Sequence, residues 1–228
     1  MSDSTPDYDG LIALYRAEVE GLTEAQLDWD DLSQEWSRWS IRRQISHVAV
    51  AYFFWIAKMW GKTLWPDDPP ADPIDFRKTA VYDRRMDEEK YWKMEDLWPK
   101  FEEAIGFAKR AAEGRSAEEM NGLSITRTFK PDLMMGETDL PVYAFWSYAS
   151  TFHEEGLDQH PDDETTFTFT LAATLRTMHW EALTHLRTIQ RLKIAQGLAP
   201  AVQVPRVGYL IDPFFWGPED EPPLHPAD

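Results

Sequence analysis

Glu181 and His185 are the residues whose types and spacing best suit chemistry. They stand four positions apart within residues 171–196, a stretch without proline or glycine. This spacing places both side chains on one face of a helix. Met178 and Leu192 follow the same stripe, so we expect that face to point into the core. An inward carboxylate beside an inward histidine costs free energy unless the two pair with each other or with a third group.

His47 is the third candidate. It stands near the start of a stretch without proline or glycine that runs to Gly61, and residues 48–57 after it are all hydrophobic. A helix that is apolar on nearly every side is surrounded by other helices. A histidine at its start must be neutral and hydrogen-bonded, or must hold a metal. With Glu181 and His185 it forms two imidazoles and one carboxylate, which can bind a divalent ion and leave coordination positions open for catalysis.

Each of these features also has an ordinary structural explanation. His47 alone is typical of a hydrogen-bonded core histidine, and a glutamate–histidine pair at this spacing is typical of a hydrogen bond along a helix face. The other histidines suit the metal less well, because His179 falls on a different face from Glu181. His153 and His160 stand beside acidic residues, and each can lie either on the surface or in a pocket. We assign no role to His225 and no residue as the general base.

Composition excludes several classes of function. The net charge of the 228-residue chain is −17 and its pI is near 4.7, which argues against nucleic acid or an anionic membrane as partner. Cysteine is absent, so disulfides, thiolate metal clusters and a cysteine nucleophile are excluded. Any metal must therefore be bound by His, Asp, Glu or water. The 11 Trp, 12 Phe and 8 Tyr are enough to line a core and an apolar pocket.

Nothing in the sequence indicates a membrane or secreted protein. The first residues, 1–4, carry neither the basic region nor the apolar core of a signal peptide. The longest apolar run, residues 48–57, is too short to cross a bilayer. We therefore expect a cytoplasmic protein.

Hydrophobic periodicity predicts four main helices, over residues 7–21, 40–60, 87–113 and 165–196. Ser40 is the expected N-cap of the second helix and Gly61 its expected end. Thr23 and Gln26 have the spacing of a capping box. Pro99 falls inside the third helix, where we expect a kink or a break into two helices.

The region between the last two helices is the hardest to interpret. Ile125–Phe129 alternates like a short strand, and residues 142–152 can form a helix of about three turns. Thr165–Thr170 also alternates, but we assign it to the start of the last helix because a long helical stretch follows. After residue 197 the chain alternates prolines with aromatics; its apolar half should pack on the helices and its acidic end, 219–228, should be disordered.

Trp39-Ser40-Ile41, with His47 six residues after the isoleucine, resembles the DinB/YfiT-like superfamily of metalloproteins. In that family this pattern opens the second helix and its histidine is the first metal ligand. The last helix of the family carries His-x-x-x-His and then a segment like HxGQI, and His185 and Gln190 fall in register with it. The resemblance covers about residues 7–110 and 166–197. This chain departs from the family at Glu181, which stands where the first histidine of the pair is usual.

The resemblance implies an all-α fold, a DinB-like four-helix bundle with up-down-down-up connectivity. It would be a single domain over residues 1–228, with an insertion at about 115–165 and a Pro/aromatic tail at about 198–228. It further implies a metal-dependent enzyme in which His47, Glu181 and His185 hold one divalent ion, Zn, Ni, Mn or Fe. That ion would activate a low-molecular-weight thiol or water toward a small electrophilic substrate, as a transferase, isomerase or hydrolase does. Relatives of this kind often form homodimers.

Two other functions remain open at this point. Glu181 can mark a degenerate site, in which case the chain is a metal-free helical-bundle protein with a binding or structural role. Alternatively, the two histidines and one carboxylate can serve an iron oxygenase. The residues alone do not decide whether the chain is an enzyme.

Overall fold

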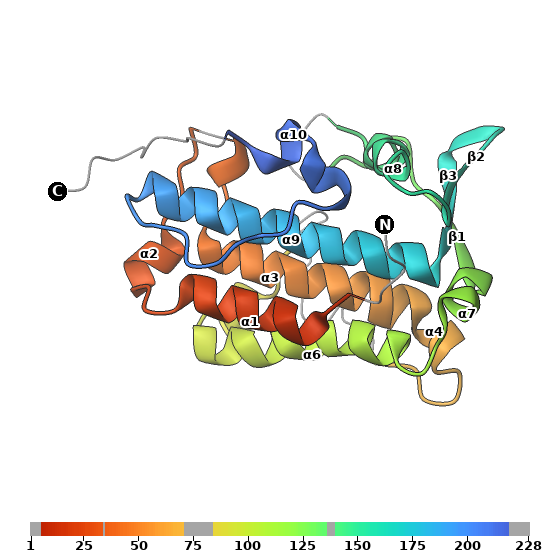
Figure 1. Ribbon diagram of the computed structural model, residues 1–228, viewed down its shortest axis with the longest axis horizontal. Helices are drawn as coiled ribbons and strands as arrows, with labels where there is room; N and C mark the ends of the chain where they lie inside the picture. Colours follow the sequence, from red (N-terminus) through yellow and green to blue (C-terminus); the bar gives the residue numbers. More distant parts are fainter. Residues whose placement is uncertain (1–5, 34, 71–83, 136–139, 219–228) are drawn as a thin grey trace.

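A computed structural model describes residues 6–33, 35–70, 84–135 and 140–218. Four long helices lie side by side, and α1 and α9 run in one direction while α3 and α6 run in the other (Figure 1). α3 packs on both α6 and α9, and α1 packs on the same two helices. The long helical segments are α1 (Tyr8–Val19), α3 (Ile41–Tyr52) continued by the π-helix η2 (Phe53–Trp60) and α4 (Gly61–Leu64), α6 (Met94–Ala112) and α9 (Leu171–Ala195).

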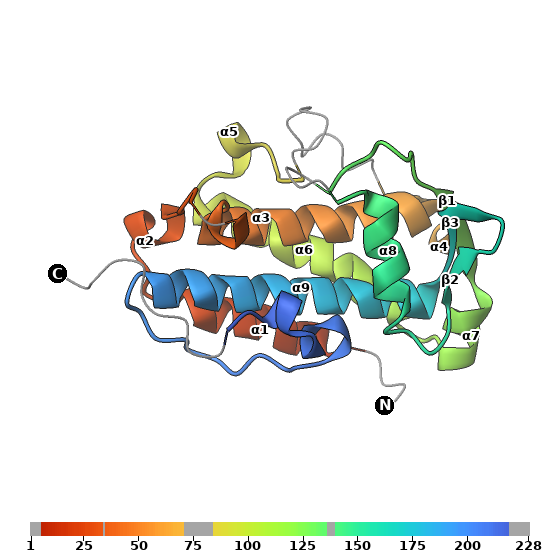
Figure 2. The same cartoon turned by 90° about the horizontal axis from the view of Figure 1, so that it is seen from above.

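The prediction of an all-α protein is wrong, because the chain also forms a three-stranded antiparallel sheet in the order β1-β3-β2. The sheet stands at one end of the long helices, and α8 lies across α3 and α9 beside it (Figure 2). The remaining elements are α2 (Glu24–Asp28), η1 (Glu35–Ser37), α5 (Glu88–Tyr91), α7 (Ala117–Gly122), β1 (Ser124–Thr128), α8 (Val142–Ser150), β2 (Leu157–His160), β3 (Asp163–Thr170), η4 (Gly208–Ile211) and α10 (Pro213–Trp216).

The alternation of Thr165–Thr170 makes it a strand and not the start of a helix, contrary to our assignment. Phe167 and Phe169 point into the core, while the threonines between them face threonines of β1, with hydroxyl oxygens 2.6 and 3.3 Å apart. In a strand, side chains alternate between the two faces, so all the phenylalanines lie on the core face and all the threonines on the other. A helix would bring threonines and phenylalanines onto the same side. α9 starts only at Leu171, after Thr170 has capped it by accepting from the Ala173 amide at 3.1 Å. β1 confirms the strand predicted there, and β2 was not predicted.

The second predicted helix, which α3, η2 and α4 form and which we call the central helix, continues past Gly61, the residue at which we expected it to end. Gly61 has helical dihedral angles, φ −50° and ψ −46°, and an added Cβ would lie 3.1 Å from the Pro70 ring. This glycine therefore allows close approach of the following loop and does not terminate the helix. Ser40 occupies the N-cap position, but its hydroxyl makes no cap hydrogen bond. The capping box of Thr23 and Gln26 is confirmed.

The third predicted helix is divided at Trp92 and Lys93, not at Pro99. Lys93 has extended dihedral angles, φ −68° and ψ 140°, and caps α6. Pro99 lies inside α6 on the exposed side together with Glu95. Because a proline lacks the N–H that would bond to the Glu95 carbonyl, solvent must supply that bond. Because this position is exposed, the missing hydrogen bond costs little free energy, and the helix continues.

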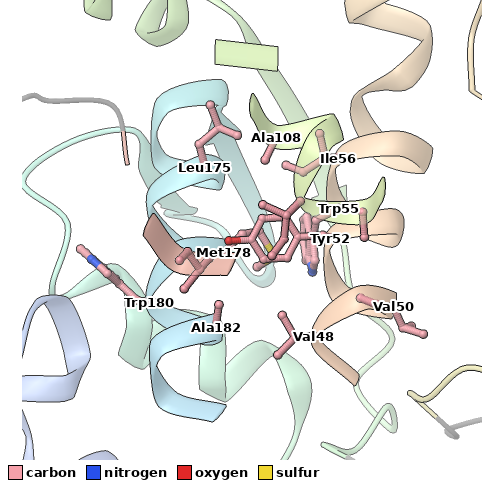
Figure 3. Close-up of a cluster of buried hydrophobic side chains, with 14 of the residues drawn as sticks. Val48, Val50, Tyr52, Trp55, Ile56, Ala108, Leu175, Met178, Trp180 and Ala182 are labelled. Carbon is pink, nitrogen blue, oxygen red and sulfur yellow. The ribbon is translucent and has the colours of Figure 1, made fainter. Parts of the chain in front are cut away.

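Aromatic residues connect the long helices to the sheet. The Trp55 ring of η2 lies 4.8 Å from Trp146 of α8 and 5.1 Å from Phe169 of β3. Figure 3 shows the buried side chains between the central helix and α9, where Tyr52 and Ile56 face Leu175 and Met178. The insertion therefore shares one core with the long helices.

The tail packs on the helices, as predicted for its apolar half, and Tyr209 and Leu210 are fully buried. Its start is attached at Glu18 of α1, which is also fully buried. The Glu18 carboxylate accepts from the Ala201 and Val202 amides at 3.0 Å and from the Lys193 ammonium at 2.6 Å.

The prediction that residues 219–228 are disordered lies outside the described residues, as does His225. In the part of the chain that the structure describes, no helix is both long enough and apolar enough to span a membrane.

Candidate metal centre

The structure brings together the three residues that the sequence predicted as metal ligands. His47 comes from α3, and Glu181 and His185 come from successive turns of α9. Each offers one ligand atom, and these atoms all lie within 4.8 Å of one another. One carboxylate oxygen of Glu181, Oε1, is 3.3 Å from His47 Nε2 and 3.2 Å from His185 Nε2. The three side chains can therefore hold a metal ion.

The surroundings of His47 determine which of its ring nitrogens carries hydrogen. Its Nδ1 lies 2.8 Å from the backbone carbonyl oxygen of Arg84. A carbonyl oxygen only accepts, so Nδ1 must carry the hydrogen. Burial, and then the positive charge that His185 carries when it is protonated, lowers the pKa of His47 to about 4. His47 is therefore neutral at pH 7, and its Nε2 directs a lone pair toward Glu181.

His185 is oriented in the same way by Gln44. The Gln44 amide donates to the Trp39 carbonyl oxygen at 3.1 Å, which turns its own oxygen toward His185 Nδ1 at 2.5 Å. Since the Gln44 oxygen accepts, Nδ1 of His185 carries hydrogen, and Nε2 has a lone pair whenever the ring is neutral. This lone pair also faces Glu181. Hydrogen bonds of this kind to the second ring nitrogen commonly orient metal-binding histidines.

Glu181 is ionised in this arrangement. Burial alone would raise the pKa of its carboxyl group, but the hydrogen bonds and charges that His185 and His47 supply when they are protonated outweigh burial and hold that pKa well below its usual value. When both rings are neutral, two imidazole lone pairs and the carboxylate converge on one small volume. Such a set repels itself unless a cation lies between its members, and so the donor atoms fit a metal ion.

Tyr209 of the tail completes the surroundings of Glu181. Its hydroxyl donates to the second carboxylate oxygen, Oε2, at 2.9 Å, and so leaves Oε1 for the histidines. Burial, followed by the negative charge of Glu181, raises the pKa of Tyr209 well above its usual value, which keeps the hydroxyl a donor. Gly208 makes this contact available, because its φ is +56° and any Cβ there would lie 2.1 Å from the Trp180 ring.

Trp39 forms one wall of the site. Its ring lies 4.9 Å from the His47 ring and stacks at 6.4 Å on the His185 ring. The Arg84 guanidinium covers the tryptophan at 5.1 Å. The tryptophan of the Trp-Ser-Ile motif therefore fixes both imidazoles in position.

A cavity of about 290 Å³ adjoins the site. His47 and Glu181 are part of its wall, and the other described residues of the wall come from α3, η2, β1, α8 and α9, from the segment between β1 and α8, and from Arg84. Most of the lining is apolar or aromatic, as is usual for small-molecule sites. The polar lining residues among those described are His47, Arg84, Arg127, Thr177 and Glu181.

The other histidines of the described chain lie elsewhere. His153 Nε2 is 2.9 Å from the Thr177 hydroxyl, and burial, then the charge of Arg176, lowers the pKa of His153 to about 3. His179 packs against Tyr8 on another face of α9, and His160 is exposed. Gln190, which the family resemblance set in register with a conserved segment, donates to Glu18 at 3.0 Å and does not contact the ligands.

Sequence reasoning missed the residues that orient the three ligands. Gln44 stands three positions before His47 on the same helix face, and this spacing was a usable signal. Arg84 acts through its backbone carbonyl, which leaves no trace in side-chain types. Tyr209 lies in a tail without periodicity, so nothing in the sequence pointed to it.

No protein-family model, curated protein or solved structure matches this chain. The resemblance to the DinB/YfiT-like superfamily therefore stays a prediction. It rests on Trp39-Ser40-Ile41, His47, His185 and Gln190.

Proposed function

We propose that the chain is a metal-dependent enzyme in which His47, Glu181 and His185 hold one divalent ion beside a substrate cavity. The observation that carries this proposal is the position of the two Nε2 atoms, which carry lone pairs when the rings are neutral. Both point at the same carboxylate oxygen, from 3.3 and 3.2 Å. A carboxylate cannot donate a hydrogen to either, whereas a cation satisfies all three groups.

The donor set narrows the choice of ion. Two imidazoles and one carboxylate suit Zn, Ni, Mn or Fe(II) and leave coordination positions for other ligands. Such an ion acts as a Lewis acid and lowers the pKa of a bound water or thiol. We propose a low-molecular-weight thiol or water as the activated group and a small electrophile as substrate, in a transferase, isomerase or hydrolase reaction. The thiol rests on the DinB-like resemblance alone.

The protein's own contribution would be orientation and exclusion of water. The Arg84 carbonyl and the Gln44 amide fix the two rings, and Tyr209 holds the carboxylate. The Glu181 side chain is 19% exposed and the His47 side chain is 5% exposed. Charges in such a site interact more strongly than they do in water.

Elemental analysis of protein purified without a histidine tag tests this proposal. We expect about one divalent ion per chain in the wild type and loss of that ion in His47→Ala. His179→Ala is the matched control, because it removes a histidine of α9 that lies outside the site, and it should keep the ion.

Wild-type protein that is purified empty and binds none of Zn, Ni, Mn or Fe(II) would overturn the metal-dependent enzyme. The metal-free binding protein would then be the better account, because the aromatic cavity can bind a small molecule without any reaction.

A further inference from the structure

We propose that Tyr209 is a positioning residue that sets the metal selectivity of the centre. Its hydroxyl binds one oxygen of Glu181 and so leaves the carboxylate a single oxygen for an ion, which favours zinc over manganese. The inference rests on the metal centre proposed above and narrows its choice of ion. It can fail while that centre stands, because it concerns how two ions are ranked and not whether an ion is bound.

The two carboxylate oxygens of Glu181 have different partners. Oε1 lies 3.3 Å from His47 Nε2 and 3.2 Å from His185 Nε2. Oε2 accepts from the Tyr209 hydroxyl at 2.9 Å. An ionised carboxylate only accepts, so the hydrogen of this bond belongs to the tyrosine. An ion beside the two histidines meets Oε1, and it competes with Tyr209 for Oε2.

Tyr209 is fixed in this position by the packing of the tail. Its side chain is fully buried. Its ring centre lies 4.7 Å from that of Phe215, which belongs to the same tail. It also lies 5.6 Å from the ring of Trp180 in α9 and 6.2 Å from that of Phe145 in α8. Glu181 therefore cannot turn Oε2 toward an ion without breaking a buried hydrogen bond, which costs free energy.

The number of donor atoms that the protein supplies affects zinc and manganese differently. The described residues offer three ligand atoms, one each from His47, Glu181 and His185. Three protein donors are the usual number in a catalytic zinc site, where one further ligand completes a tetrahedron. Manganese prefers six ligands, most of them oxygens, and binds a given site more weakly than zinc does. A second oxygen from Glu181 would therefore help manganese more than zinc.

The other orienting contacts do not change the number of donors. Gln44 binds the Nδ1 side of His185, and the Arg84 carbonyl binds the Nδ1 side of His47. A neutral imidazole has one lone pair with or without such a contact. Loss of these contacts should weaken the binding of every ion alike. Only Tyr209 contacts an atom that can itself become a ligand.

Titrations of the full-length protein with zinc and with manganese test the inference. Competition with a fluorescent chelator gives the zinc affinity, and the paramagnetic resonance signal of free Mn²⁺ gives the manganese affinity. Tyr209→Phe releases Oε2. We expect its zinc affinity to fall about 10- to 100-fold, as is common when an orienting contact is lost. Its manganese affinity should fall less, so the ratio of zinc to manganese affinity should drop at least about tenfold.

Two variants are matched controls. Tyr148→Phe also removes a hydroxyl that binds a carboxylate of the tail, that of Asp212, and it should keep both affinities. Gln44→Leu removes the contact to His185. It should lower both affinities by a similar factor and keep their ratio.

Near-ultraviolet circular dichroism will show whether Tyr209→Phe is folded. If it is not, Gly208→Ala replaces it. The φ of Gly208 is +56°, and a Cβ there would lie 2.1 Å from the Trp180 ring, so alanine displaces the turn that carries the hydroxyl. The affinity ratio should then drop in the same way.

An unchanged affinity ratio in Tyr209→Phe, whether both affinities stay or fall together, would overturn the inference and leave the metal centre in place. A drop of equal size in Gln44→Leu would also overturn it, because any loss of orientation would then change the ratio. Wild-type protein that binds neither ion would overturn the metal centre itself, and this inference with it.

Discussion

Glu181 is the residue on which the proposed binding of a metal ion most depends. Its Oε1 faces two imidazole nitrogens and its Oε2 accepts from Tyr209. A histidine at position 181 would present another lone pair or another N–H, whereas the carboxylate contributes a negative charge. The charge lets the site hold a cation with only two imidazoles.

Glu181→Gln should therefore have opposite effects on the metal-free and the metal-loaded protein. The amide group of glutamine can donate to one histidine lone pair, so we expect the variant to melt higher than the wild type in chelator. One net hydrogen bond is worth about 0.5–1.5 kcal/mol, or roughly 2–4 °C per kcal/mol at this chain length. Added Zn²⁺ should raise the melting temperature of the wild type only.

A lower melting temperature of Glu181→Gln in chelator would contradict this account. It would mean that a histidine donates a hydrogen to Glu181 in the wild type, and that no ion is needed between them.

Tyr209→Phe should weaken metal binding without removing it. The hydroxyl orients a ligand but is not one, and loss of such a contact commonly costs about 10- to 100-fold in affinity. Competition with a fluorescent chelator measures the change. Tyr148→Phe is the control, because the Tyr148 hydroxyl binds Asp212 of the same tail and does not contact Glu181. Equal affinities in the two variants would exclude a role for Tyr209 at the site.

At the scale of elements, the attachment of the tail depends on a buried ion pair. Lys193 of α9 donates to Glu18 of α1 at 2.6 Å, and both side chains are almost fully buried. Lys193→Met leaves Glu18 without its charge partner, which typically costs about 3–5 kcal/mol. The remaining donors to Glu18 put the expected loss near the lower value, and chemical denaturation measures it.

Lys109→Met provides the comparison for this substitution. Lys109 also pairs with an aspartate at 2.6 Å, but both partners are exposed, so its removal should change stability little. If both substitutions destabilise equally, the Glu18 contact does not hold the tail.

The sequence predicted those elements whose pattern follows a single period. The helical stretch ending near residue 196 and the three inward-facing ligands were found from spacing and residue type. Thr165–Thr170 was misassigned because its period of two adjoins a period of 3.6, and only the pairing with β1 decides between them. Gln44, Arg84 and Tyr209 contact the ligands only because the tertiary fold brings them together. Gln44 is 141 residues from His185 in the sequence, and Arg84 contacts His47 through its backbone carbonyl.

Acid stability is a property of the whole molecule to which His153 contributes. Burial holds the pKa of His153 at about 3 in the folded chain, against about 6.5 when unfolded. Between these values the unfolded chain binds more protons, so stability must fall as the pH drops from about 6.5 and stop falling from this cause below about 3.

His153→Gln should reduce this dependence in metal-free protein, because glutamine does not titrate and can still bond to Thr177. The measurement is the free energy of unfolding in urea at several values between pH 3 and 7. His160→Gln, at an exposed position, should reproduce the wild-type profile. Identical slopes in all three proteins would mean that His153 is accessible to protons in the folded state.

The hydrogen bonds of the buried Glu18 carboxylate can form only late in the synthesis of the chain. The side chains that donate to it, Gln190 and Lys193, come 172 and 175 residues later in the chain. At about 5–20 residues per second on the ribosome, Glu18 waits roughly 9–35 s for them. Two of the three proposed metal ligands, Glu181 and His185, lie in the same late segment, so a nascent chain would offer only His47 to an ion. We therefore expect metal to be loaded after the finished chain leaves the ribosome, which makes cellular metal supply at that moment a determinant of which ion is bound.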